Sequence, residues 1–273
     1  MVIDIYQSLF ENLSFGLAII DNSNRIVESN NLFNIYFKYN HNGKPLKLDQ
    51  LHSSFQNVPI SSFKEKTKLT LSDEKVLSIQ ASPFKNGLWL IEVLDISLQE
   101  IENEDFYIRA NYDQLTHLPN RQLFNDRCKQ ALSAAYRHKE NLALFFIDVD
   151  DFKSINDTYG HEVGDSVLLE TAKRLTDSVR ESDTVSRWAG DEFSILLPKI
   201  GSKENIKQLL NRLLESFSEP QHAQNFQIPV SLSLGISLAP QMGTDFDKLM
   251  RFADKAMYEA KNTSGFCYKY YSE

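Results

Sequence analysis

The sequence predicts an α+β protein built from two folded units and a helical linker. Three observations support this fold class. Strand-sized apolar runs separated by turn residues fill residues 1–97, a charged helical stretch follows over residues 98–112, and residues 113–273 alternate strands and helices with a β-α-β-β-α-β core. The length of 273 residues is enough for two domains of ordinary size.

The N-terminal unit is expected to be a small antiparallel sheet with a few helices on one side. Asn86 and Gly87 stand between two apolar runs, and Asn-Gly in that position is a strong hairpin signal. A helix is expected over residues 31–39. The strands are expected over residues 15–21, 26–30, 67–71, 76–84 and 88–96.

The linker carries a row of residues at alternating spacings of three and four, which is a heptad pattern with one polar interruption. So short a pattern is compatible with a single amphipathic connector helix and with a short parallel coiled coil between two protomers, and both alternatives stay open. The residues of this row are Leu98, Ile101, Asp105, Ile108, Tyr112 and Leu115.

The C-terminal unit is expected to have the split βαβ arrangement of ferredoxin-like domains, preceded by a helix over residues 120–139. In that topology the first strand and the central hairpin lie side by side in the middle of the sheet. Residues 150–170 are interpreted as the crossing from strand to helix, in which Gly160 and Gly164 allow close backbone approach. Strands are expected over residues 142–150, 183–188, 193–198 and 228–237, and helices over 165–179, 203–217 and 246–261.

The composition excludes several classes of protein. The net charge of −8 argues against a nucleic acid or an anionic membrane held by bulk electrostatics. No apolar run approaches the ~20 residues of a membrane span, and the N-terminus lacks the basic start and cleavage site of a signal peptide. Cys128 and Cys267 have no disulfide or metal spacing. A soluble cytoplasmic protein is therefore expected.

Two pairs of acidic residues are predicted to meet at one edge of the C-terminal sheet. Asp148 and Asp150 end the first strand, and Asp191 and Glu192 lie at the tip of the hairpin beside it. Nearby carboxylates repel one another unless a cation compensates them, and hard oxygen ligands select Mg²⁺ or Mn²⁺. One pair alone would favour solvated loop acids, but two converging pairs favour a metal site, as in nucleic-acid polymerases.

The segment after the first strand has features of a nucleotide site. Backbone N–H groups at a loop and helix start can bind phosphates, and Lys153 adds a positive charge. Asn156 and Asp165 provide the donors and acceptors that read a guanine edge. Taken singly, Asp165 is better explained as a helix N-cap and Asn156 as a turn residue, so the nucleotide prediction rests on the whole set.

Several long motifs resemble those of GGDEF domains, the catalytic units of bacterial diguanylate cyclases. The match covers roughly residues 113–265, and residues 1–97 resemble a PAS sensor domain that ends in Asp95, Ile96 and Ser97. The matching motifs are DQLTHLPNR (113–121), FIDVDDFKSINDTYGHEVGD (146–165), RESD (180–183), RWAGDEF (187–193), VSLSLGIS (230–237) and ADKAMYEAK (253–261).

The resemblance implies condensation of two GTP into cyclic di-GMP by a homodimer, with Mg²⁺ or Mn²⁺ as cofactor and regulation by the PAS domain. It implies a metal site made by Asp148, Asp191 and the Val149 carbonyl. The implied catalytic residues are Asp191, Glu192 and Lys153; the implied substrate-binding residues are Phe152, Asn156, His161, Asp165 and Lys261; and Arg180 and Asp183 would form a product-inhibition site.

Two departures from the family pattern leave an alternative open. Ala189 replaces the leading glycine of the motif, which matters only if that position needs a positive φ. Ser264 and Gly265 stand where the family has Gly and Arg, so no arginine follows Lys261. The alternative is a module that binds GTP or cyclic di-GMP without turnover. The sequence does not indicate the PAS ligand, and no phosphodiesterase domain is expected after residue 265.

Overall fold

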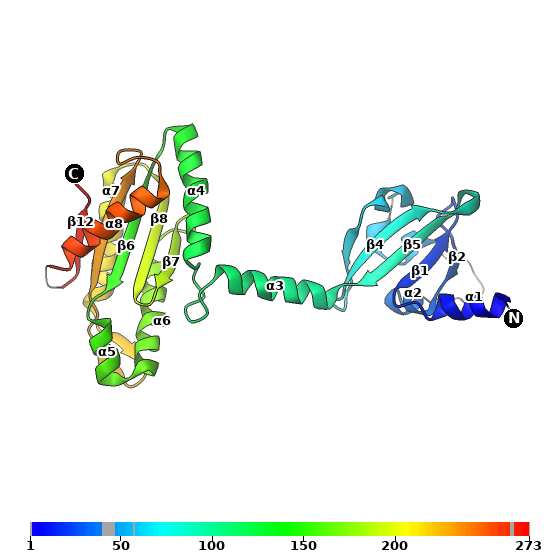
Figure 1. Ribbon diagram of the computed structural model, residues 1–273, viewed down its shortest axis with the longest axis horizontal. Helices are drawn as coiled ribbons and strands as arrows, with labels where there is room; N and C mark the ends of the chain where they lie inside the picture. The colour runs from blue at the N-terminus through cyan, green and yellow to red at the C-terminus, as the bar shows by residue number, and fades with distance from the viewer. Residues whose placement is uncertain (1, 40–46, 57, 263–264, 273) are drawn as a thin grey trace. The chain divides into compact units, whose positions relative to one another are not determined.

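The structure is a computed structural model that describes residues 2–39, 47–56, 58–262 and 265–272 (Figure 1). The chain divides into two compact units, Met1–Phe106 and Tyr107–Glu273. The division falls inside helix α3 (Ser97–Asn111), and the domain boundaries at residues 97 and 112 remain a prediction. Within the described ranges, no helix has the length and apolar character that a membrane crossing needs.

The N-terminal unit contains the expected antiparallel sheet, an arrangement consistent with a PAS-like domain. Its strand order is β2-β1-β5-β4-β3, and Asn86 and Gly87 in the β4–β5 turn both have positive φ. Helices α1 (Val2–Glu11) and α2 (Asn31–Tyr36) precede and follow the first hairpin. The strands are β1 (Gly16–Ile20), β2 (Ile26–Ser29), β3 (Thr67–Thr70), β4 (Val76–Pro83) and β5 (Trp89–Asp95). Short 3-10 helices cover Leu48–Gln50, Ser53–Phe55, Ile60–Lys64 and Lys85–Gly87.

Side-chain hydrogen bonds fasten the start of α3 to this sheet. Asp95 accepts from the Ser97 amide at 3.0 Å and from the Ser97 hydroxyl at 2.6 Å, and Ser97 Oγ accepts from the Val76 amide at 2.9 Å. The residues that end the PAS-like motif therefore hold the connector helix to β4 and β5.

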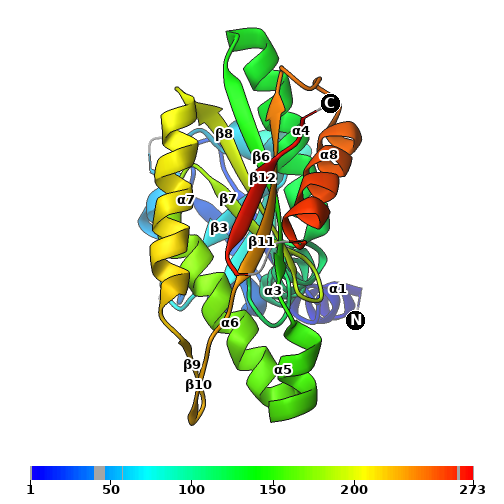
Figure 2. The same cartoon turned by 90° about the vertical axis from the view of Figure 1, so that its left-hand side faces the viewer.

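The C-terminal unit has a five-stranded sheet of order β12-β11-β6-β8-β7, with helices on both faces (Figures 1 and 2). The segment β6-α6-β7-β8-α7-β11 is the predicted ferredoxin-like core. Only β8 of the hairpin pairs with β6, and β7 lies at the edge, so the prediction of a central hairpin was half right. The strands are β6 (Asn141–Val149), β7 (Thr184–Ala189), β8 (Glu192–Ile200), β9 (Gln221–Ala223), β10 (Phe226–Ile228), β11 (Leu232–Ala239) and β12 (Cys267–Tyr270). The helices are α4 (Arg121–His138), α5 (Phe152–Tyr159), α6 (His161–Ser178), α7 (Lys203–Ser218) and α8 (Phe246–Ala260).

The alternation of side chains along β6 decides which helices face the end of this strand. Phe145 and Ile147 pack in the core that includes α6 and α7, and Leu144 and Phe146 pack in the core that includes α4 and α8. Figure 2 shows α7 on one side of the sheet and α8 on the other. Because side chains alternate along a strand, Asp148 lies on the same face as α8.

Three predicted elements need correction. The segment interpreted as a crossing loop forms helix α5, because Phe152 and Ile155 place an apolar side on the core, and Gly160, with φ +88°, separates α5 from α6. The strand predicted from residue 228 begins at Leu232, after the β9–β10 hairpin. Helix α3 ends at Asn111, so Tyr112 and Leu115 do not continue the heptad row.

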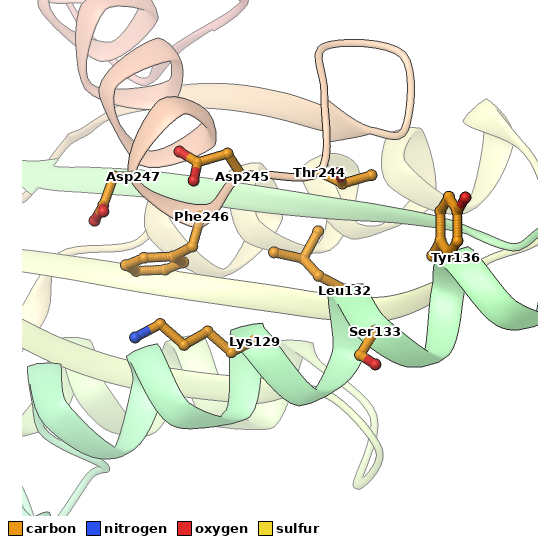
Figure 3. A pocket seen from close by; sticks show the side chains of 8 residues that line it. All are labelled: Lys129, Leu132, Ser133, Tyr136, Thr244, Asp245, Phe246 and Asp247. Carbon is orange, nitrogen blue, oxygen red and sulfur yellow. The ribbon is translucent and has the colours of Figure 1, made fainter.

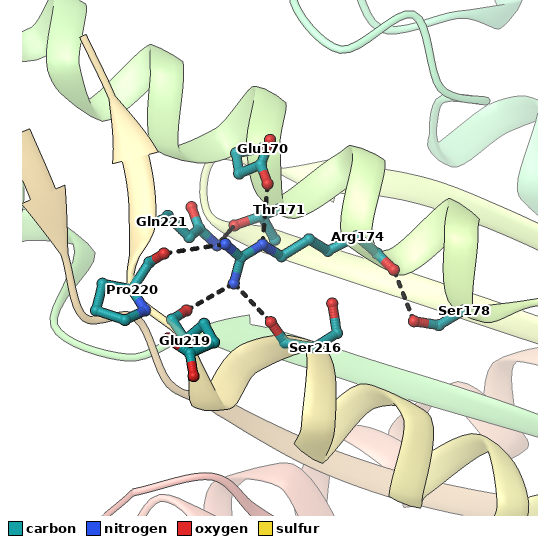
Figure 4. A network of polar contacts seen from close by, with 8 residues as sticks. All are labelled: Glu170, Thr171, Arg174, Ser178, Ser216, Glu219, Pro220 and Gln221. Carbon is teal, nitrogen blue, oxygen red and sulfur yellow. Dashed lines mark hydrogen bonds and ion pairs between the residues drawn. The ribbon is translucent and has the colours of Figure 1, made fainter.

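Arg174 of α6 joins three elements of the C-terminal unit (Figure 4). Its guanidinium donates to Glu170 Oε1 at 3.0 Å and to the carbonyl oxygens of Ser216 at 2.6 Å, Glu219 at 2.8 Å and Pro220 at 3.1 Å. The last carbonyls of a helix have no partner within the helix. Arg174 therefore supplies donors at the end of α7 and holds the connection to β9 in place.

Arg174→Gln should lower the free energy of unfolding of the C-terminal unit by about 2 kcal/mol, because it leaves several carbonyl oxygens without a charged donor. Urea denaturation followed by Trp188 fluorescence, in a Trp89→Phe background, reports on this unit alone. Arg251→Gln, at an exposed position of α8, is the matched control. Equal midpoints for the two variants would contradict the assigned role.

Candidate active site

The two predicted acidic pairs meet where β6 ends beside β8. Asp148 stands opposite Glu192 in the register of the two strands, and the Val149 amide donates to the Asp191 carbonyl at 3.2 Å. The structure therefore brings the pair Asp148 and Val149 to the pair Asp191 and Glu192, more than forty positions further along the sequence.

Lys261 contributes a positive charge to this cluster. It caps the C-terminal end of α8, and its Nζ donates to Asp148 Oδ2 at 2.7 Å. The side chain of Asp148 is 8% exposed and that of Lys261 is 40% exposed. The sequence predicted Lys261 near phosphates; its contact with Asp148 depends on a long-range approach of α8 to β6 that no local pattern reveals.

Burial and the neighbouring acids raise the pKa of both Asp148 and Glu192. Burial and then the charges of Asp191 and Asp150 raise the pKa of Asp148, with Lys261 acting against them. Burial and the charges of Asp148, Asp191 and Asp254 raise the pKa of Glu192. Burial lowers the pKa of Lys261, but the hydrogen bond and attraction from Asp148 outweigh it. The site thus has an excess of negative charge that favours a cation.

The donor atoms fit a hard divalent cation. Carboxylates and a main-chain carbonyl are the oxygen ligands that Mg²⁺ and Mn²⁺ prefer. In the described part of the chain, no three His, Cys, Asp or Glu side chains are gathered as a complete metal site. A set of two carboxylates with the Val149 carbonyl does not need a third side chain of this kind, so the residues present fit the ion that the sequence predicts.

Asp150 differs from the other acids of the cluster, because two serine hydroxyls donate hydrogen bonds to its carboxylate. One serine belongs to β11 and the other precedes this strand. The Asp150 carboxylate accepts from Ser231 Oγ at 2.6 Å and from Ser233 Oγ at 2.7 Å, and its amide donates to the Ser231 carbonyl at 3.1 Å. Asp150 therefore anchors the end of β6 to the neighbouring strand.

The turn that carries Asp191 is held by Arg187. Arg187 donates from Nε to the Gly190 carbonyl at 2.9 Å and from Nη1 to Asp113 at 3.0 Å. Burial acts to raise the pKa of Asp113, but hydrogen bonds from Thr116 and Arg187 outweigh it, and the pKa lies below its ordinary value. Arg187 and Asp113 lie in two of the family motifs, but the sequence alone indicates no role for either residue. It also does not reveal that Asp254 acts on Glu192.

The structure shows whether alanine at position 189 strains the backbone of the turn. Ala189 is a strand residue of β7 without a positive φ, and the left-handed residue of the turn is Gly190, with φ +52°. The second glycine of the motif meets the conformational requirement, so a methyl group at position 189 is tolerated.

The predicted guanine-binding residues lie where α5 meets α6. A Cβ atom on Gly164 would lie 1.9 Å from Asn156 Oδ1 and 3.3 Å from the Phe152 ring, so only glycine lets Asn156 lie against α6. Asp165 follows Gly164 inside α6 and is not its N-cap, since the helix begins at His161. Lys153 and His161 are exposed, on α5 and at the start of α6.

The two predicted product-inhibition residues form a turn between α6 and β7. The Arg180 amide donates to Asp183 Oδ2 at 2.9 Å, and the Asp183 amide donates to the Arg180 carbonyl at 2.9 Å. A hollow of about 520 Å³ beside this turn is lined by Asp183, Ser182 and Arg127 of α4, among others. Of the two residues that make up the departure after Lys261, Ser264 lies outside the described residues, and Gly265 is exposed with φ +82°.

Another hollow, of about 430 Å³, lies between α4 and the first turn of α8 (Figure 3). Lys129 and Tyr136 line it from α4, and Asp245 and Asp247 from the start of α8. It is at the opposite end of α8 from Lys261 and contains none of the predicted site residues, so it is not the candidate active site.

Comparisons with known proteins agree with this geometry. The family described as "Diguanylate cyclase, GGDEF domain" matches residues 110–265, and this chain belongs to that family. The bifunctional diguanylate cyclase/cyclic di-GMP phosphodiesterase MucR of Pseudomonas aeruginosa is 39% identical over 168 residues, covering 61% of this chain and 24% of MucR. Diguanylate cyclase TpbB of the same species is 40% identical over 161 residues, covering 59% of this chain and 37% of TpbB. The match thus spans well under half the length of either relative.

A solved structure of a related domain also supports the family assignment and shows the fold. The crystal structure of the GGDEF domain of TpbB is 38% identical to this chain, with a TM-score of 0.56. The match covers 58% of this chain and 99% of that domain. The C-terminal unit therefore has the GGDEF fold.

Glu192→Gln should stabilise the protein when no divalent ion is present. The raised pKa of Glu192 means that the folded protein binds this proton more tightly than the unfolded chain does. Stability is therefore lost as the pH rises from the ordinary value of 4.5 through the raised pKa. Above that window we expect a gain of roughly 0.5 kcal/mol, which disappears at about pH 4.

Thermal melting with a chelator between pH 4 and pH 8 measures this effect. Glu204→Gln, an exposed acid at the start of α7, removes the same charge outside the cluster. If Glu192→Gln and Glu204→Gln melt together at pH 8, the assigned repulsion is absent.

Proposed function

We propose that the protein is a diguanylate cyclase that condenses two GTP into cyclic di-GMP and releases two pyrophosphates. The observation that carries this proposal is the convergence of Asp148, Asp191 and Glu192 with Lys261 at the end of β6. A GGDEF domain that kept only a binding role would have no use for a half-buried cluster of mutually repelling acids.

Each residue of the site has a role in this reaction. Asp148, Asp191 and the Val149 carbonyl would hold Mg²⁺ or Mn²⁺, which when bound polarises the α-phosphate and makes the 3′-hydroxyl more acidic. Asp191, supported by Glu192, receives the proton of the 3′-hydroxyl. The 3′-oxygen then forms a bond to the α-phosphorus, and the bond from that phosphorus to pyrophosphate breaks.

The remaining residues bind and orient GTP. Asn156 and Asp165 take the guanine edge, with Phe152 and His161 beside them, and Gly164 supports this arrangement by leaving room for Asn156. Lys153 offsets charge that develops on the phosphate, and Lys261 binds the outer phosphates.

The reaction needs two copies of the chain, because each GTP attacks the other and each C-terminal unit holds one. The PAS-like unit would regulate how the copies meet. Leu98, Ile101 and Ile108 of α3 are exposed. This exposure fits the coiled-coil alternative for the linker, and a monomeric connector remains the competing form.

Incubation of the purified protein with GTP and Mg²⁺, followed by detection of cyclic di-GMP, tests the proposed activity. We expect product and pyrophosphate in a ratio of one to two. Binding of GTP or cyclic di-GMP without product, at high protein and GTP concentrations, would establish the binding module instead. The observation in favour of that second candidate is Gly265, which stands where the family has an arginine for phosphate.

Product inhibition is proposed at Arg180 and Asp183. An arginine can bond to O6 and N7 of guanine, and an aspartate accepts from its N–H groups. Arg180→Ala should raise the concentration of cyclic di-GMP that halves the rate by about tenfold, the loss of one good bidentate contact. Arg251→Ala is the control, and equal inhibition of the two variants would contradict the assignment.

A further inference from the structure

The ion pair between Lys261 and Asp148 conflicts with the roles that the two residues have when nucleotide is bound. The proposed function gives the Asp148 carboxylate to a divalent ion and Lys261 to the outer phosphates of GTP. With Lys261 Nζ donating to Asp148 Oδ2 at 2.7 Å, the lysine occupies one of the oxygens that the ion needs. The lysine and the ion compete for the same carboxylate, so we expect the site to have two states.

The lysine is the partner that can move. Asp148 has a short side chain that is 8% exposed on the central strand β6. Lys261 follows the last residue of α8, has a long flexible side chain, and is 40% exposed. A competing cation or anion therefore displaces Lys261 while Asp148 stays in place.

We propose that Lys261 is an exchangeable counter-ion that blocks the metal site until nucleotide arrives. This inference rests on the proposed function. In the protein without nucleotide, Lys261 neutralises Asp148 and competes with a divalent ion for its carboxylate. The complex of the ion with GTP supplies both replacements at once, a cation for Asp148 and a polyphosphate for Lys261.

Cooperative binding follows from this exchange. The ion alone must displace a positive charge that Asp148, Asp191 and Asp150 all attract, so it binds weakly. Polyphosphate draws Lys261 away and frees Asp148. Nucleotide should therefore raise the affinity for the ion, and by linkage the ion should raise the affinity for nucleotide by the same factor.

Binding of Mn²⁺ to the full chain, measured by the electron paramagnetic resonance signal of free Mn²⁺ at pH 8, tests the proposal without turnover. Lys261→Met should bind Mn²⁺ alone about tenfold more tightly than the unmodified protein, the effect of removing one nearby like charge. Lys255→Met removes the same charge from α8, where Lys255 lies 5.5 Å from the Tyr271 ring, and should not change Mn²⁺ binding. Lys261→Arg keeps the cation and should retain weak binding.

The second arm adds a GTP analogue with a methylene group between the α- and β-phosphorus atoms, which cannot release pyrophosphate. In the unmodified protein the analogue should raise Mn²⁺ affinity, and in Lys261→Met this gain should shrink about tenfold. Unchanged or weaker Mn²⁺ binding by folded Lys261→Met would overturn the proposal, and so would absence of Mn²⁺ binding by both proteins. Cyclic di-GMP formation is scored separately, so a protein that makes product without this exchange, or shows the exchange without product, separates the two proposals.

Discussion

Asp148→Asn should reduce cyclic di-GMP formation by at least about 10²-fold, because it removes the carboxylate that we propose as a ligand of the divalent ion. The substitution keeps the shape of the side chain, so the register of Asp148 opposite Glu192 should survive. The measurement is the initial rate of product formation at saturating GTP and Mg²⁺.

Asp247→Asn is the matched control for this experiment. Asp247 lies in the first turn of α8, at the opposite end of the helix from Lys261, and lines a hollow that contains no predicted site residue. Circular dichroism should show that both variants are folded. Full activity of Asp148→Asn would refute the site, and loss of activity in Asp247→Asn would point to an effect on the fold.

Gly164→Ala should lower kcat/KM for GTP by roughly 10- to 100-fold, because a misplacement of about 1 Å in a substrate-positioning residue has effects of that size. The new Cβ would lie 1.9 Å from Asn156 Oδ1, so Asn156 must leave its position against α6. We expect the larger change in KM, since the proposed role of Asn156 is to orient guanine and not to transfer a proton. Steady-state kinetics with GTP measure both constants.

Gly201→Ala provides a control of the same chemistry. A Cβ at Gly201 would also approach an asparagine, at 3.3 Å from Asn205 Oδ1, but this pair lies at the start of α7. Both variants remove a glycine that has no positive φ, so backbone strain is matched. If the two variants lose activity equally, the close approach of Asn156 to Gly164 does not support substrate binding.

The sequence predicted the elements whose side chains alternate or repeat clearly. Strand β6, with apolar residues on both faces, and α8, with its regular apolar row, lie within a residue or two of their expected ranges. Helix α5 was missed because Gly160 and many polar residues suggested a loop, whereas burial of Ile155 and Phe152 decides the structure. Strand β12 has only four residues and is defined by its parallel pairing with β11, which no local pattern reveals.

The convergence of the acidic residues could be predicted better than their individual contacts. The positions of Asp148 and Asp191 follow from strand ends and topology, so their meeting could be predicted. The contact of Lys261 with Asp148, the hydrogen bonds of Asp150 to Ser231 and Ser233, and the effect of Asp254 on Glu192 depend on how α8 and β11 pack against β6. These are long-range approaches that spacing along the chain cannot specify.

The last strand has a consequence for anyone who isolates the C-terminal unit. The family match ends at residue 265, but β12 pairs with β11 beyond that point, and Tyr271 donates to the Ile236 carbonyl at 2.9 Å and stacks on Phe252 at 4.0 Å. A fragment cut at the end of the match would keep every recognised motif and lose the strand that holds the segment after Lys261 to the sheet. The natural place to cut this domain is therefore after Tyr271.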